Sequence, residues 1–155
     1  MSNLCKLGRD NKGRDVFLIT LKSEELQAEV LSFGATLKDL RFNGFENSLV
    51  LGYSSLQDYL CDKNYAGVTI GRYANRISNG RYYLNSHKFD LDKNEVYATL
   101  HGGSESCHNS SWEIEDYDYN FVELTYKFNE NIYIKVYLHI YISIYLYIYV
   151  YIYVI

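Results

Sequence analysis

The chain has 155 residues, the size of a single domain and long enough to bury a core. Its net charge of −4 argues against the basic face of a nucleic-acid binder, so no nucleic-acid partner is expected. The three cysteines, Cys5, Cys61 and Cys107, form no CxxC pair and predict neither a zinc site nor a disulfide framework. The polar start of the chain, residues 1–15, lacks the apolar stretch of a signal peptide, which favours a cytoplasmic protein.

Residues 16–130 consist mainly of short β-favouring runs separated by turn signals. The expected strands, in chain order, are Val16–Leu21, Leu26–Phe33, Leu37–Phe42, Gly80–Leu84, His87–Leu91, Trp112–Glu115 and Phe121–Phe128. Asn43-Gly44 is a strong turn signal, and Asn85-Ser86 joins its flanking strands into a hairpin. One helical turn is expected at Ser54–Leu60, with Ser54 or Ser55 as N-cap. Many short strands at this spacing predict an all-β sandwich or barrel.

From Ile132 to Ile155 the chain consists almost entirely of Tyr alternating with Ile, Val and Leu. This run is longer than an ordinary strand of about 3–10 residues. A repeated AT dinucleotide, read in triplets, encodes alternating Ile and Tyr, so we interpret the run as translated simple-sequence DNA. On this interpretation residues 1–130 are the domain and residues 131–155 are a low-complexity tail outside it. The chain is then the front part of a longer protein.

Two other interpretations of this tail stay open. Val136–Ile155 contains no acidic residue, Lys or Arg and has the roughly 20 residues of a membrane helix, but it carries Tyr at every depth, whereas Tyr prefers membrane interfaces. The run could also form genuine paired strands, for which we expect no packed partner layer to set the register. In every case a neutral, proline-free, β-favouring run predicts a tendency to aggregate.

Two glycine-marked segments are too polar for core strands, namely Gly67–Ile77 and Leu100–Gly103. Glycine lets the backbone approach a ligand or adopt a positive φ. The segments contain side chains that match sugar hydroxyls in donor and acceptor capacity: Arg72, Asn75, Arg76 and His101. By pattern alone, we first interpret these side chains as ordinary turn and surface residues, because Arg and Asn near glycines usually are. No metal is predicted, because the histidines lack HxH or HxxxH spacing: His87, His101, His108 and His139.

These segments belong to a series of stretches that resembles the aldose 1-epimerase (galactose mutarotase) family. The stretches occur in family order over about residues 10–128: LSFGATLKDLRF (Leu31–Phe42), NSLVLGYSSLQDYL (Asn47–Leu60), NYAGVTIGRYANRISNGRYYLN (Asn64–Asn85) and LHGG (Leu100–Gly103) with Trp112 beyond it. The pairing of GRxANRI with LHGG is the specific part. Two departures occur. Cys107-His108-Asn109 stands where the family often has a Gly-Phe-Asp-like stretch, and the tail matches nothing in the family.

The resemblance implies an antiparallel galactose-mutarotase-like β-sandwich, here truncated to roughly its first half, that binds an aldohexose in an open cleft. It implies an isomerase that interconverts the α and β anomers of hexoses such as glucose and galactose by acid/base ring opening, without a cofactor. Asn75 and Arg76 match the sugar-contacting pair of the family, and His101 matches its substrate-contacting histidine. His101 can only assist, because the general acid His and general base Glu of the family have no counterpart here. His139 lies outside any family motif.

Two alternatives of other classes remain beside this interpretation. One is a non-catalytic carbohydrate-binding module that keeps the same wall of the sugar site. The other is a membrane-tethered protein that uses the tail as its anchor.

Overall fold

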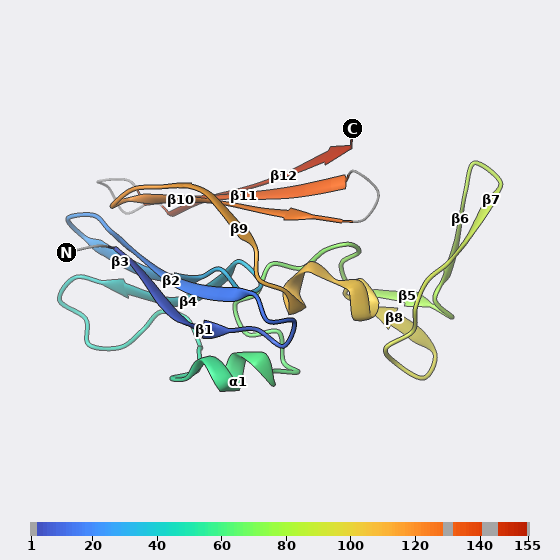
Figure 1. The fold of residues 1–155 in the computed structure, drawn as a ribbon, viewed down its shortest axis with the longest axis horizontal. Helices are drawn as coiled ribbons and strands as arrows, with labels where there is room; N and C mark the ends of the chain where they lie inside the picture. Colours follow the sequence, from blue (N-terminus) through green and yellow to red (C-terminus); the bar gives the residue numbers. More distant parts are fainter. Residues whose placement is uncertain (1–2, 129–131, 141–145, 155) are drawn as a thin grey trace.

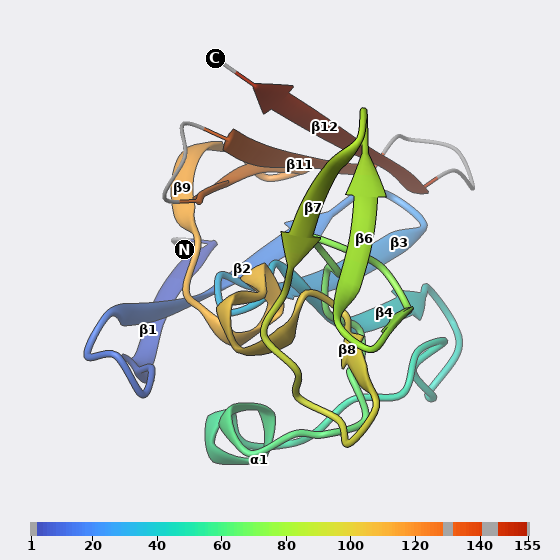
Figure 2. The same cartoon turned by 90° about the vertical axis from the view of Figure 1, so that its right-hand side faces the viewer.

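The computed structural model describes residues 3–128, 132–140 and 146–154. Its strands form two four-stranded antiparallel sheets, stacked one above the other in Figure 1 and Figure 2, and two two-stranded ladders. The first sheet has the order β1-β2-β3-β4, from Leu4–Arg9, Asp15–Lys22, Leu26–Leu31 and Thr36–Phe42. The second has the order β12-β11-β10-β9, from Leu146–Val154, Ile132–Ile140, Phe121–Lys127 and Glu113–Tyr117. The predicted all-β antiparallel sandwich is confirmed.

The core lies between the two sheets because each strand points alternate side chains inward. β2 contributes Ile19 and Leu21, which are fully buried, and β10 contributes Val122 and Leu124. Helix α1 (Leu56–Leu60) lies on the outer side of the first sheet, where Tyr59 joins a smaller apolar cluster. Ser55 caps this helix by accepting a hydrogen bond from the Asp58 N–H at 3.2 Å, one of the two predicted N-caps.

Strand β11 brings part of the tail into the core. It pairs with β10 from Phe121↔His139 to Lys127↔Tyr133, and with β12 on its other side. Four aliphatic side chains at every second position are at most 3% exposed and belong to the same core cluster as β2 and β3: Ile134, Val136, Leu138 and Ile140. Between them, Lys135 is only partly buried and donates to Glu123 on β10 at 2.6 Å.

The expectation that a strand from the tail has no packed partner layer is therefore wrong for Ile132–Ile140. The register with β10 turns the aliphatic half of the alternation toward the first sheet, and burial of that face fixes the register. The structure thus has the paired strands of the third interpretation. That residues 131–155 lie outside the native domain stays a prediction. Residues 131, 141–145 and 155 of that segment lie outside the described part of the chain.

The remaining elements lie at one end of the sandwich, on the right of Figure 1. β5 (Arg76–Ser78) pairs with β8 (Ala98–Leu100), and β6 (Arg81–Leu84) forms a hairpin with β7 (His87–Asp90). Two 3-10 turns follow β8: Gly103–Glu105 and Cys107–Asn109. The hairpin turn is the predicted Asn85-Ser86, both of which have the positive φ that such turns require.

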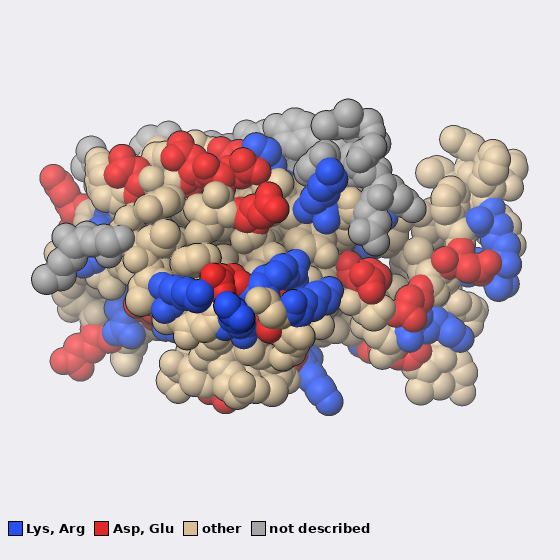
Figure 3. Space-filling view, in the orientation of Figure 1, with Lys and Arg blue, Asp and Glu red and all other residues tan. Residues whose placement is uncertain are grey.

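Charges of both signs are spread over the face seen in Figure 3. Acidic side chains gather over β9, where Glu113, Glu115 and Asp116 are exposed. A basic group lies over β1 and its following turn, where Lys6 and Arg9 both pair with Asp15. Within the described residues, no helix is both long and apolar enough to cross a membrane.

A buried carboxylate ties the β1–β2 turn to the segment before β9. Asp10 accepts hydrogen bonds from the N–H groups of Lys12 and Arg14 at 2.9 Å, and from the Ser111 N–H at 3.0 Å. Its side chain is 1% exposed and also pairs with the Arg14 guanidinium. Burial alone would raise the pKa of Asp10, but these hydrogen bonds outweigh it and lower the pKa to about 2.

This carboxylate predicts a loss of stability in acid. The unfolded pKa of an Asp is about 3.9, so the contribution of Asp10, on the order of 2 kcal/mol, is complete above about pH 4. It should disappear as the pH falls from about 4 to about 2, because the folded pKa is the lower one. We expect the difference in unfolding free energy between wild type and Asp10→Asn, measured by denaturant titration, to shrink over that range. A difference independent of pH would contradict the assignment.

The packing of β11 predicts that the tail contributes to stability. Leu138→Ala should cost about 2–5 kcal/mol of unfolding free energy because it opens a cavity in the core. Lys135→Ala, on the outward face of the same strand, should cost less than about 1 kcal/mol. Thermal and denaturant melts of the full chain measure both. If β11 does not pack as described, the two variants will melt like the wild type.

Candidate functional site

The two predicted polar segments meet at one end of the β5–β8 ladder. Arg76 is opposite Leu100 in this ladder, so Asn75 and His101 are the next residues beyond its last pair. The Asn75 carbonyl accepts a hydrogen bond from the His101 N–H at 3.1 Å, and the Asn75 N–H donates to His101 Nδ1 at 3.0 Å. The predicted site residues Asn75, Arg76 and His101 are therefore brought together by backbone geometry, although His101 lies far beyond the other two in sequence.

A tight backbone turn on the LHGG side holds His101 in this position. Asn75 and His101 have φ values of 62° and 52°, a region that Asn tolerates better than most residues. Gly102 follows with a φ of +89°, and a Cβ there would lie 2.5 Å from the carbonyl oxygen of Arg72. Only glycine fits this close approach, which explains why the motif has a glycine directly after its histidine.

Arg76 is held by a carboxylate that the sequence analysis did not select. Its Nε and one terminal nitrogen each donate to Glu95 at 2.7 Å, a bidentate arrangement. The hydrogen bonds raise the pKa of Arg76 and lower the pKa of Glu95. A guanidinium has five N–H donors and Glu95 takes two, so the group keeps donors for a ligand while its orientation is set.

Tyr65 connects this cluster with a second histidine. The ring of Tyr65 makes edge-on contacts with His101 and with His108, at centroid distances of 4.5 and 5.0 Å. Nδ1 of His108 in turn lies 2.5 Å from the hydroxyl oxygen of Ser106, which is buried. Burial lowers the pKa of His108, and the neighbouring His101 lowers it further, so the ring is neutral at physiological pH.

A cavity of about 350 Å³ opens beside Tyr65 and His108. Phe33 and Val68 give it an apolar side, and Asn109 and Asp62 give it polar groups. Asp62 is fixed by the Tyr53 hydroxyl at 2.7 Å and by the N–H groups of residues 64 and 66 at 2.8 Å. Burial alone would raise the pKa of Asp62, but these hydrogen bonds outweigh burial and lower the pKa overall.

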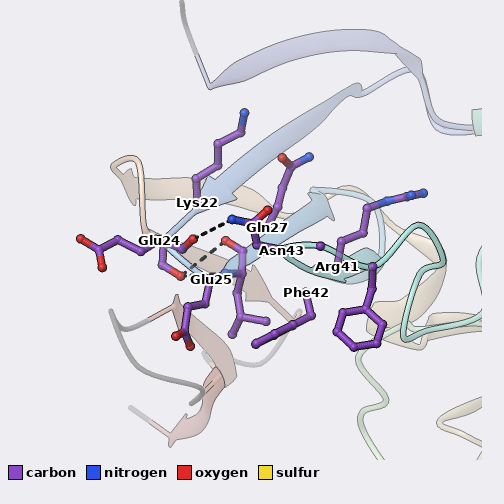
Figure 4. Close-up of a pocket in the computed structure, with 11 residues that line it drawn as sticks. Lys22, Glu24, Glu25, Gln27, Arg41, Phe42 and Asn43 are labelled. Carbon is purple, nitrogen blue, oxygen red and sulfur yellow. Dashed lines mark hydrogen bonds between the residues drawn. The ribbon is translucent and has the colours of Figure 1, made fainter.

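A second cavity, of about 330 Å³, lies far from this cluster, between the turn after β2 and the end of β4. Figure 4 shows that the polar ends of Lys22, Gln27 and Arg41 point apart from one another. Its internal hydrogen bonds hold the turns, as in the bond from Asn43 Nδ2 to the Glu24 carbonyl at 3.4 Å. Side chains that diverge in this way do not converge on one ligand, so we assign no site here.

The cluster rests on the core through Gly71. A Cβ at Gly71 would lie 2.7 Å from Cδ1 of Ile134, on β11. The carbonyl of Gly71 accepts a hydrogen bond from the Ser106 hydroxyl at 2.8 Å. The next residue, Arg72, places its guanidinium 5.1 Å from the ring centroid of Phe128. Strand β11 thus lies directly behind the GRxANRI segment.

The structure brings together all three predicted site residues, and their contact with a sugar stays a prediction. The guanidinium of Arg72 packs over the ring of Phe128, so we do not include Arg72 in the candidate site. Sequence reasoning did not find Glu95 or Tyr65. It considered His108 only as a rejected metal ligand and as part of a departure from the family. Nothing in the sequence marks Glu95 as a site residue, because it lies in an ordinary polar loop. Tyr65 could have been found, because it lies within one of the stretches that match the family.

Comparisons with known proteins identify the family of this chain. The sequence profile of the family described as aldose 1-epimerase matches residues 18–143. The chain is 44% identical over 90 residues to an uncharacterised isomerase of Saccharomyces cerevisiae, a match that covers 57% of this chain and 26% of that protein. It is 34% identical over 94 residues to the galactose mutarotase of Mus musculus, covering 59% of this chain and 28% of that protein.

A solved structure of a GalM/aldose epimerase homologue from C. elegans aligns with a TM-score of 0.74 at 29% identity, over 79% of this chain and 41% of that chain. The chain thus spans about a quarter of the length of the two relatives and less than half of the solved structure. The family profile includes both polar segments and all of β11, so the expectation that the tail matches nothing in the family is wrong for residues 131–143. The chain belongs to the aldose 1-epimerase family.

Proposed function

We propose that this chain carries one wall of the sugar site of a mutarotase, an aldose 1-epimerase that interconverts the α and β anomers of hexoses such as glucose and galactose. The observation that carries the proposal is the pair of hydrogen bonds between Asn75 and His101, with Arg76 as the neighbouring residue. These bonds gather the family-matched side chains at one end of the β5–β8 ladder. We also retain the cytoplasmic location as a proposal.

The chemistry of this reaction explains why such residues suit it. A base removes the proton from the C1 hydroxyl while an acid protonates the ring oxygen, after which the ring opens, C1 rotates and the ring closes on the other face. Arg76 and His101 would donate hydrogen bonds to sugar oxygens and stabilise the charge that develops near the ring oxygen. The Asn75 N–H occupies Nδ1 of His101, which leaves the Nε2–H of that ring as the donor.

Proton transfer needs two groups that we place outside this chain. Neither the general acid His nor the general base Glu of the family has a counterpart in the matching stretches, so we propose that the chain is a fragment. Each positioned acid or base typically contributes about 10²–10⁴-fold to such a reaction. The expected property of this chain alone is therefore sugar binding without turnover, which is also what a non-catalytic carbohydrate-binding module would show.

The absence of an acid and a base predicts that the chain does not catalyse mutarotation. Polarimetry of fresh α-D-glucose or α-D-galactose with the purified chain should follow the buffer rate. Arg76 and His101 can only stabilise charge that no other group helps to form. Clear catalysis that is lost in His101→Ala would contradict the fragment interpretation, and it would assign the proton transfer to an unmatched residue such as His108 or His139.

Sugar binding is tested by removing Arg76. Arg76→Ala should weaken glucose binding about tenfold or more, because a hydrogen bond to a charged group contributes about 1.5–3 kcal/mol. Titrations followed by NMR chemical shifts measure the dissociation constant. The matched control is Arg81→Ala, since Arg81 is also exposed and paired with a carboxylate, Asp90, at 2.6 Å. Equal affinities for the two variants would remove Arg76 from the site.

A further inference from the structure

The outer edge of β12 differs from the other edges of the two large sheets. β12 is the outermost strand of the second sheet (Figure 1), and it pairs with β11 over nine consecutive positions without a bulge. Its sequence, LYIYVYIYV, contains no charged residue, proline or glycine. A long, regular and uncharged edge strand presents a row of N–H and C=O groups that favours pairing with a further strand.

The other three outer strands carry the features that usually prevent such pairing. β1 has a bulge and the exposed cations Lys6 and Arg9. β9 has a bulge and the three exposed acidic residues described above. The edge of β4 is covered, because the Leu37 N–H donates to the Gly67 carbonyl at 2.9 Å. Within the described residues, β12 is therefore the one edge of the two large sheets that lacks charges, bulges and cover.

The alternation makes β12 complementary to itself in an antiparallel pairing centred on Val150. Each residue is then opposite the residue at the same distance on the other side of Val150, so that Tyr149 is opposite Tyr151 and Ile148 is opposite Ile152. Aromatic positions meet aromatic positions and aliphatic positions meet aliphatic ones along the whole strand. A shift by one residue would place every Tyr opposite an aliphatic residue, because the pattern has a period of two.

The same matching already occurs within the chain, between β11 and β12. Ile134 pairs with Ile152 and Tyr133 pairs with Tyr153 in that ladder. On β11 the aliphatic positions are the buried ones, so opposite positions of equal kind keep one face of the sheet aliphatic. The register centred on Val150 would continue this aliphatic face from one copy of the chain into a second copy.

We propose that two copies of this chain associate through β12, antiparallel about a two-fold axis at Val150, and join their second sheets into one continuous sheet. A strand has two edges, and β11 occupies one edge of β12, so the second copy fills the other and the assembly closes at two. The outer strands of the joined sheet are then the two protected β9 strands. A closed pair differs from the open-ended aggregation that the composition of the tail predicts.

The first test measures the mass of the full chain by sedimentation over a dilution series. We expect twice the mass of one chain at high concentration and the mass of one chain on dilution. Amide hydrogen exchange then locates the contact, because alternate N–H groups of an antiparallel strand point to opposite edges. Dilution should speed exchange at every second residue of β12, and the N–H groups bonded to β11 should stay protected.

Two double variants test the register. Tyr149→Glu with Tyr151→Glu places like charges opposite each other at two positions of the pair, and it should give single chains. Tyr149→Lys with Tyr151→Glu is the matched control, because it places opposite charges at the same two positions and should restore the pair. Both variants have Glu at position 151, opposite Lys135 of β11, so they differ only at position 149. The dissociation constants should differ about tenfold or more.

Each other outcome overturns the inference. A wild-type chain that stays single at every concentration has no such contact, and a mass that grows beyond two copies shows an open assembly. A pair that survives equally in both double variants uses another surface or another register. If both variants unfold, hydrogen exchange of the wild type decides, because rapid exchange at every second residue of β12 at high concentration excludes the contact.

Discussion

The contact between the two sheets is the constraint on which both the fold and the candidate site depend. Ile134 enters the core from β11 and at the same time occupies the space beside Gly71 where any side chain would clash. The carbonyl of Gly71 then receives the Ser106 hydroxyl, which orients His108. One apolar contact therefore connects the aliphatic face of the tail strand, the segment before Asn75 and the turn that follows LHGG.

Around this apolar base, carboxylates hold the surface loops by accepting hydrogen bonds. Asp10 fixes the β1–β2 turn against residue 111, Asp62 fixes the loop before Tyr65, and Glu95 fixes the guanidinium of Arg76. Each anion is stabilised by several donors, which is why the pKa of each lies below its ordinary value. The loops of the site are thus ordered by polar contacts, whereas the sheets are ordered by burial of apolar side chains.

Neutral donors and acceptors dominate the part of the site near Tyr65. His101 and His108 each have one ring nitrogen committed to a protein group, and the other nitrogen keeps a defined role as donor or acceptor. This arrangement suits a neutral polyhydroxylated ligand, because such a ligand offers hydroxyls and no charge. Arg76 differs, since its charge is balanced by Glu95 and its remaining donors suit an oxygen that becomes negative during ring opening.

Local sequence signals were sufficient for much of the fold. The β-favouring runs predicted β2, β4 and the β6–β7 hairpin to within one or two residues, because alternation and turn residues act over a few positions. β1 was missed because LCKLGR has no clear alternation, and β5 and β8 were missed because three-residue strands have no period to detect. The family motifs likewise identified Asn75, Arg76 and His101 directly from the sequence.

Only the tertiary structure decided how the distant parts combine. The alternation of the tail predicts strands, but whether their aliphatic face is buried depends on β10 offering an edge and on the first sheet offering an apolar surface. Glu95, Tyr65 and His108 join the site through contacts between segments about 20–40 residues apart in sequence. Such contacts depend on chain folding rather than on neighbouring residues, so a pattern with a period of two or four positions carries no information about them.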